Sequence, residues 1–440
     1  MNERQSSSKL ASSTSTRHLA DVIVTAAQSS RKVNIDAANI AQLHLSNLKL
    51  HGRGDDIKLL RSKLREFVKK KNDEEDAAQN NERHDESNLK RQSANNNLIL
   101  VSGTSGTGKS TLIRKGLGDP ATKIGLAFAS GKIDEKLLRP LSAFSDAMAS
   151  LAKNMHMMVE HNEKAGLSIA ALTRDKIQNE FPEEDVIQLR RVLPGCAELL
   201  NTSTSSGAGA DAAALFSLGS ASVANLGSLN PLAGKESISQ IHYAIRRLLK
   251  IICSNLKGVV LFIDDLQWSD TSTLDLLKSI VLDGEIPNLL IVGAYREDEV
   301  PDNHPLALSI RDLESINVPI TKIKVGNLDI DNAIPLVAQV LNMDDYDNKV
   351  KSLAKTIHKK TDGNPFYVIM FLRSLYDEKL LQYNVGTMKW TWDDEAVKSK
   401  IVTENVASVL VNKMSRLEEE TQRMLMVASC LGATFRLSAT

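Results

Sequence analysis

The sequence predicts an α/β fold in which one parallel sheet carries helices on both faces, and two features of the middle of the chain indicate it. Short, continuous apolar runs recur there, as is typical of strands that are buried on both sides. Segments with apolar residues at helical spacing lie between these runs. Because consecutive parallel strands are normally joined by a crossover helix, this alternation favours a single parallel sheet.

Five segments have the composition of such strands: residues 98–101, 124–129, 259–263, 289–292 and 320–325. The segment before the third strand has the clearest helical pattern, with one apolar face formed by Ile238, Ile241, Ile245, Leu248, Leu249 and Ile252. After residue 326 the strand pattern stops, and three apolar helical stripes follow within 330–341, 350–357 and 366–381. We therefore expect a small helical domain after the α/β domain.

Composition limits the classes of protein to consider. The 54 basic and 54 acidic residues give a formal net charge of +0, which argues against a dedicated nucleic-acid or membrane-surface protein. Cys196, Cys253 and Cys430 form no CxxC pair and indicate reduced thiols. There is no apolar segment of a secretory signal, and no apolar run approaches the roughly 18 residues of a membrane helix. We expect a soluble protein of the cytoplasm or nucleus, with no membrane partner.

A complete phosphate-binding loop lies between the first expected strand and a helix. Residues 103–110 read Gly-Thr-Ser-Gly-Thr-Gly-Lys-Ser, which is the P-loop, or Walker A, pattern. Glycines let the backbone curl so that successive N–H groups point at a triphosphate, and the helix adds the positive end of its dipole. Lys109 would reach the β- and γ-phosphates, and Ser110 would bind Mg²⁺. The candidate ATP-binding residues here are Gly103, Thr104, Ser105, Gly106, Thr107, Gly108, Lys109, Ser110 and Thr111.

Two acids end the third expected strand. A carboxylate at the tip of a buried parallel strand lies beside the phosphate loop, so Asp264 is the candidate Mg²⁺ ligand. Asp265 is the candidate for polarising the attacking water, which it must reach with a hydrogen bond. Aspartate is one methylene shorter than the glutamate that many such ATPases use, so we expect slow hydrolysis. As an alternative, the two acids could cap the helix expected at 271–281.

Other polar and aromatic residues lie near the expected strand ends. Arg296, at the tip of the fourth strand, is a candidate catalytic residue that recognises the γ-phosphate, and a solvated surface arginine is the alternative. Trp268 is expected to pack beside the sheet edge, and Lys132 and Asp134 to be solvated loop charges. Trp390 and Trp392 alternate, as on the packing face of a hairpin strand.

The order of these motifs resembles the signal-transducing (STAND) branch of AAA-type ATPases. The resemblance rests on segments that begin at residues 50, 103, 261, 293 and 363 and read LHGR, GTSGTGKST, LFIDDLQWSD, GAYR and GNPF. It is strongest to the "predicted ATPase" module, also described as an origin-recognition-complex-like AAA ATPase domain. That module is fused to protein kinases, histidine kinases, nucleotide cyclases and transcription regulators.

The resemblance implies further site residues and a sheet order. Gly52 and Arg53 would line the adenine side, Arg296 would be the first sensor, and Pro365 would touch the nucleotide from the helical domain. The strand order would be 5-1-4-3-2, and the final helices would begin a winged-helix domain. The sequence departs from the family pattern at Gly54, where the family usually has an acid.

The expected organisation has four parts. Residues 1–45 form a disordered or helical N-terminal tail, and residues 46–326 form the AAA-type P-loop ATPase domain, with low-complexity insertions at 70–97 and 202–236. A helical lid follows at 327–385, and 386–440 are the start of a winged-helix domain. We expect this last part to be truncated, because its two helices lack a partner layer.

These patterns favour a nucleotide-controlled signalling switch. ATP and Mg²⁺ would bind between the α/β domain and the lid, and slow hydrolysis would let the domains move. The output would pass to a protein partner or a fused effector domain, and oligomerisation is open. One alternative is a DNA-binding ATPase of the replication-initiator kind, which the balanced charges of residues 404–431 do not favour. The other is a nucleotide-binding scaffold without turnover.

Overall fold

The computed structural model describes residues 43–79, 98–135, 140–158, 169–200, 231–283, 286–400, 414–415 and 417–430. Within these ranges the chain forms two units, and it crosses between them after Gly52 and after Gly326. We call residues 53–326 the α/β unit and residues 43–52 with 327–400 the helical unit. Outside both ranges, α19 (Glu419–Cys430) is helical. No helix in the described ranges is long and apolar enough to span a membrane.

The α/β unit is built on a parallel sheet that has five strands in the described part of the chain. The strands are β1 (Leu98–Gly103), β2 (Ala127–Lys132), β3 (Val259–Asp264), β4 (Leu289–Arg296) and β5 (Ile320–Lys324). Every neighbouring pair is parallel, and the order is β2-β3-β4-β1-β5. This is the predicted order 5-1-4-3-2 read from the other edge, so the predicted fold class is confirmed.

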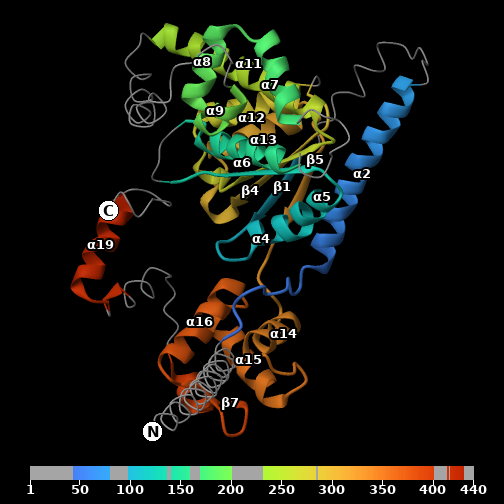
Figure 1. Ribbon diagram of the computed structural model, residues 1–440. Coiled ribbons are helices and arrows are strands. Elements are labelled where there is room, and N and C mark those ends of the chain that lie inside the picture. Colours follow the sequence, from blue (N-terminus) through green and yellow to red (C-terminus); the bar gives the residue numbers. More distant parts are fainter. Residues whose placement is uncertain are drawn as a thin grey trace, which may run out of the picture. The chain divides into compact units, whose positions relative to one another are not determined.

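Helices cover both faces of this sheet, as the uninterrupted apolar strands require (Figure 1). On one face, Leu261, Ile263 and Ile291 belong to a buried cluster with the helices that follow β2, β3 and β4. These are α6 (Ser142–Met158), α7 (Ile169–Glu180), α8 (Glu183–Val192), α9 (Ala197–Leu200), α11 (Pro231–Asn255), α12 (Thr271–Leu282) and α13 (Pro305–Ser315). The alternate residues face the other way, where the Phe262 ring lies 6.2 Å from that of Phe128.

The second face is covered by the helices next to the phosphate loop. They are α2 (Gly54–Gln79), α4 (Lys109–Ile113) and α5 (Asp119–Lys123), and a π-helical turn (Arg114–Gly118) joins the last two. Gly116 of this turn lies against Leu60 of α2, and Gly118 lies against the Phe128 ring. The phosphate loop is therefore held between a buried strand and a buried helix.

Several boundaries differ from the sequence expectation. The α2 helix continues to Gln79, so the first ten residues of the expected insertion 70–97 are helical, in line with the helix propensity of their lysine, glutamate and alanine residues. Likewise, α11 begins at Pro231, inside the expected insertion 202–236. The β2 strand starts at Ala127 instead of residue 124, because a turn with Gly125 at a φ of 82° ends α5 first.

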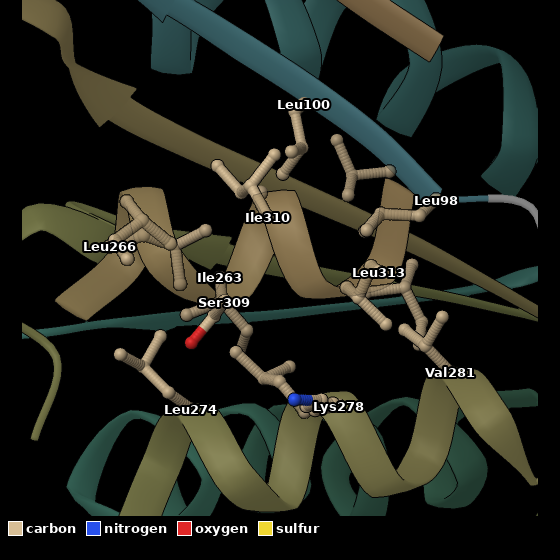
Figure 2. A pocket seen from close by; sticks show the side chains of 15 residues that line it. Leu98, Leu100, Ile263, Leu266, Leu274, Lys278, Val281, Ser309, Ile310 and Leu313 are labelled. Atoms are coloured by element: carbon tan, nitrogen blue, oxygen red, sulfur yellow. The ribbon is translucent and has the colours of Figure 1, made fainter. Parts of the chain in front are cut away.

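A small cavity lies between the sheet and the pair α12 and α13, and Figure 2 shows its lining. Its volume is about 40 Å³, and Leu100, Ile263, Leu274 and Ile310 are among the apolar side chains that surround it. None of the sequence-predicted site residues lines it. The cavity is therefore a gap in core packing and separate from the phosphate loop.

The helical unit contains α14 (Ile330–Leu341), α15 (Asn348–Thr361), α16 (Pro365–Asp377) and α17 (Asp394–Ser399). The third helix was expected to reach residue 381, but it ends at a turn in which Lys379 has a φ of 58°. A hairpin of β6 (Leu381–Asn384) and β7 (Lys389–Trp392) follows, as the alternating tryptophans predict. Trp390 is buried and donates its indole N–H to the Leu341 carbonyl at 2.8 Å.

The hairpin therefore shares its core with the three preceding helices. The predicted winged-helix start at 386–440 stays a prediction, because residues 401–413 and 431–440 lie outside the described residues, as does most of the predicted tail 1–45.

A close approach of α6 to β2 predicts a sensitive glycine. A methyl group on Gly131 of β2 would lie 1.8 Å from the Ala143 carbonyl oxygen of α6. We expect Gly131→Ala to lower the free energy of unfolding by about 1–3 kcal/mol, as overpacking does. Chemical denaturation measures this change. Gly54→Ala is the control, because nothing lies within 4 Å of the added methyl group. Equal stability of the two variants would contradict the close approach.

Candidate functional site

The predicted site residues of the α/β unit meet at the carboxyl ends of the strands. Gly103 at the end of β1 is in register with Arg296 at the end of β4, and Lys132 of β2 is in register with Asp264 of β3. Because the strands are parallel, their ends share one edge of the sheet. The phosphate loop, two acids and two basic side chains are thus brought to one place.

The phosphate loop has the backbone shape that its glycines predict. Gly103, Gly106 and Gly108 have φ values of 151°, 81° and 90°, a region that other residues rarely adopt. Gly103 also tolerates no side chain, since a Cβ atom would lie 2.2 Å from the Val325 carbonyl oxygen. The α4 helix begins directly after Gly108, so the positive end of its dipole adjoins the loop.

Lys109 is buried in the loop and uses the loop's own carbonyl groups as partners. Its Nζ donates to the Gly103 oxygen at 2.9 Å and to the Thr104 oxygen at 2.8 Å. Burial lowers the pKa of Lys109, as does the nearby Arg296, while the charges of Asp265 and Asp264 act in the opposite direction. The ammonium group is therefore close to both acids and to the arginine of β4.

Asp264 is buried at the end of β3 and contacts the first turn of α4. Its carboxylate is hydrogen-bonded to the Ser110 hydroxyl and accepts from the Asp265 N–H at 3.1 Å. Burial raises the pKa of Asp264, which the hydrogen bond with Ser110 partly offsets and the charge of Asp265 reinforces. A hydroxyl and a carboxylate are the hard oxygen ligands that Mg²⁺ prefers, so this pair fits the expected metal.

Asp265 has a left-handed backbone conformation, with a φ of 58° and a ψ of 46°. Its Oδ2 pairs with Lys132 Nζ at 3.1 Å, and its Oδ1 accepts from Gln267 Nε2 at 3.2 Å. The alternative in which the two acids cap the next helix is wrong, since Asp270 is the residue that caps α12. Asp265 is instead held at the strand ends, facing the basic groups of the site.

Arg296 is not the solvated surface arginine considered as an alternative. Its guanidinium lies over the Trp268 ring, 4.7 Å from the centroid, and its Nη1 is 2.6 Å from Glu299 Oε1. Its Nε is 3.9 Å from Asp265 Oδ1. Trp268 packs against the core as expected, so it provides a fixed platform for the arginine.

The residues expected on the adenine side and in the lid are divided between the two units. Arg53 is buried in the α/β unit, where its Nη2 donates to the Thr107 carbonyl at 3.1 Å and to the Gly326 carbonyl at 2.5 Å. Gly52 and Pro365 belong to the helical unit. Gly52 lies against Asn332, and Pro365 is the first residue of α16. The adenine and lid roles of these three residues stay predictions.

Two residues of the site were missed by the sequence reasoning. Lys132 was expected to be a solvated loop charge; its side chain is indeed 65% exposed, but the residue belongs to the end of β2 instead of a loop and pairs with Asp265. Gln267 is 4% exposed and contacts Asp265, but it was not singled out. A signal for Lys132 was its place at the end of the strand beside Asp264, and a signal for Gln267 was its polar side chain two residues after Asp265.

Comparison with protein families identifies a match in the α/β unit. Residues 87–292 match the model of the AAA ATPase domain. This segment contains the phosphate loop, both acids and the β3 strand, and the match agrees with the resemblance inferred from the motifs.

Among curated proteins, the chain is 24% identical over 405 residues to the hybrid signal transduction histidine kinase G of Dictyostelium discoideum. The match covers 77% of this chain but 10% of that protein, so the chain spans about a tenth of its relative's length.

Two solved structures are similar to the chain at low sequence identity. One is a STAND protein of Pyrococcus horikoshii with a tetratricopeptide repeat sensor, which is 12% identical with a TM-score of 0.32, over 79% of this chain and 34% of that one. The other is the ORC2 protein of Aeropyrum pernix in ADPNP–ADP complexes, 9% identical with a TM-score of 0.37, over 74% of this chain and 65% of that one.

The buried charge of Asp264 leads to a prediction about stability without nucleotide. Its pKa is raised in the folded state, so the stability that its protonated form contributes is present below the unfolded-state pKa and is lost as pH rises through the folded-state pKa. Asp264→Asn keeps the shape and removes the charge. We expect it to raise the thermal unfolding midpoint at pH 7, and the difference from wild type to shrink towards about pH 4.

Thermal unfolding of the nucleotide-free protein at both pH values measures this effect. Asp302→Asn is the control, because that acid is exposed and its charge is already solvated. A midpoint at pH 7 that is lower for Asp264→Asn than for wild type would contradict the destabilising charge.

Proposed function

We propose, from the match of residues 87–292 to the AAA ATPase domain, that the chain is a nucleotide-controlled switch that binds ATP with Mg²⁺ and hydrolyses it slowly. The observation that carries the proposal is the contact of Ser110 with Asp264 beside Lys109. A hydroxyl, a carboxylate and an ammonium group there suit a metal-bound triphosphate. Bound Mg²⁺ would supply positive charge that neutralises the phosphate oxygens.

Each polar group of the loop has a defined part in this proposal. The loop N–H groups and the start of α4 would bind the phosphates. Lys109 would exchange the carbonyl groups of Gly103 and Thr104 for phosphate oxygens, which are stronger partners for an ammonium group. Ser110 and Asp264 would hold the metal, and Asp265 would orient the attacking water.

The contacts of Arg296 support a switch that responds to the γ-phosphate. The guanidinium is paired with Glu299 and lies 3.9 Å from Asp265. A γ-phosphate would compete with Glu299 for this arginine, and its loss on hydrolysis would return the arginine to Glu299. Such differential binding is what lets a ligand shift the population of two states.

Arg53 links the phosphate loop to the point where the chain leaves the α/β unit, and so could pass on a change in the nucleotide. Its guanidinium joins the Thr107 carbonyl of the phosphate loop to Gly326, the residue after which the chain leaves the α/β unit. A change in the loop would therefore reach this connection directly. By similarity to a hybrid signal transduction histidine kinase, we propose that the output acts on a fused effector domain or a protein partner.

The first test is the Lys109→Ala variant. We expect its affinity for a fluorescent ATP analogue with Mg²⁺ to fall by about 10- to 100-fold, since it loses a charged contact to phosphate. Fluorescence anisotropy measures the binding, and circular dichroism checks the fold. Lys58→Ala removes an exposed lysine of α2 and is expected to bind like wild type. Equal binding by Lys109→Ala would remove the assigned site.

The second test separates binding from hydrolysis. Asp265→Ala is expected to release phosphate about 100-fold more slowly than wild type, because the attacking water loses its partner, while ATP affinity stays within a few-fold. Phosphate release under single-turnover conditions measures the rate, with Asp302→Ala as the exposed control. Undiminished release would exclude Asp265 from catalysis, and no release by wild type would favour a binding scaffold.

A further inference from the structure

Gln267 lies between the ends of β3 and β4 and contacts both. It is in the short helical turn Leu266–Trp268 that follows Asp265, and it is 4% exposed. Its Nε2 donates to Asp265 Oδ1 at 3.2 Å, and its Oε1 accepts from the Arg296 N–H at 3.1 Å. One buried amide therefore joins Asp265 and Arg296, two residues to which the proposed function gives parts in γ-phosphate recognition and hydrolysis.

The partners of Gln267 fix which way its amide group points. The Arg296 backbone N–H can only donate, so the side-chain oxygen must face it. The β3–β4 ladder ends at the pair Ile263 and Gly293, so this N–H lies beyond the last strand partner on that side. The NH₂ group is then left for the Asp265 carboxylate, which can accept but cannot donate when ionised.

We infer that Gln267 is a positioning residue, which orients the Asp265 carboxylate for hydrolysis. The inference rests on the proposed function, because it acts through Asp265. Lys132 holds the other carboxylate oxygen, but its side chain is 65% exposed, and exposed ion pairs are weak and easily exchanged. Arg296 Nε is 3.9 Å from the oxygen that Gln267 contacts at 3.2 Å. The Gln267 contact is the shorter of the two, buried and charge-assisted, so it limits rotation of the carboxylate.

A purely structural role for Gln267 would need only its hydrogen-bond acceptor, whereas a positioning role also needs its donor. If the residue only completes the hydrogen bonding of β4, an acceptor for the Arg296 N–H is enough. Gln267→Glu keeps the size and that acceptor but cannot donate to Asp265 when ionised, whereas Gln267→Met loses both hydrogen bonds. The two variants therefore separate the donor from the acceptor.

We expect both variants to lower kcat for ATP by about 10- to 100-fold, the cost of a misplaced catalytic group. KM and the affinity for a fluorescent ATP analogue should stay within about twofold of wild type for Gln267→Met, because Gln267 is not assigned to the nucleotide. Gln188→Glu makes the same charge change at an exposed position of α8 and should leave kcat unchanged.

The contact itself can be measured without nucleotide. In protein labelled with ¹⁵N-glutamine, the side-chain amide signal absent from Gln267→Met identifies Gln267. We expect Asp265→Ala to shift this signal, and Asp302→Ala to leave it in place.

The outcomes distinguish the inference from the function it rests on. Suppose that wild type hydrolyses ATP and Asp265→Ala does not. A wild-type kcat for Gln267→Glu, or a Gln267 amide signal that does not shift in Asp265→Ala, would then overturn the inference alone. A wild type without turnover would overturn both the proposed hydrolysis and the positioning role.

Discussion

The contact between Asp264 and Ser110 is the constraint on which the candidate site depends. It joins the end of β3 to the first turn of α4, although β3 and β1 are separated in the sheet by β4. The carboxylate is buried and its pKa is raised by that burial. Burying this carboxylate lowers the stability of the fold, and a bound cation would offset that cost. Such a compromise between stability and function is common.

Much of the fold could be predicted because its signals are local. The apolar strands 98–101 and 259–263 are buried on both faces, so their composition alone marks them. The phosphate loop needs glycine at three positions, and each has the backbone conformation that only glycine adopts easily. The strand order came from the resemblance, because nothing in the residues of one strand specifies its neighbours.

What could not be predicted depends on contacts between distant segments. The Arg53 guanidinium reaches carbonyl groups 54 and 273 residues away, and backbone carbonyls leave no mark in a sequence. Lys132 is an exposed charge, and its pairing with Asp265 follows only once β2 is known to lie beside β3. The burial of Gln267 could not be predicted for a different reason. A polar residue in a turn is ordinarily solvated, and this one is buried because β4 extends past β3.

The stacking of Arg296 on Trp268 has an optical consequence. The chain has three tryptophans, and Trp390 and Trp392 lie in the hairpin of the helical unit. Trp268 is thus the sole indole of residues 53–326, and its ring carries the guanidinium that would sense the γ-phosphate. The intrinsic fluorescence of Trp268 depends on the groups stacked on its ring. It can therefore report the position of the Arg296 guanidinium without an added label.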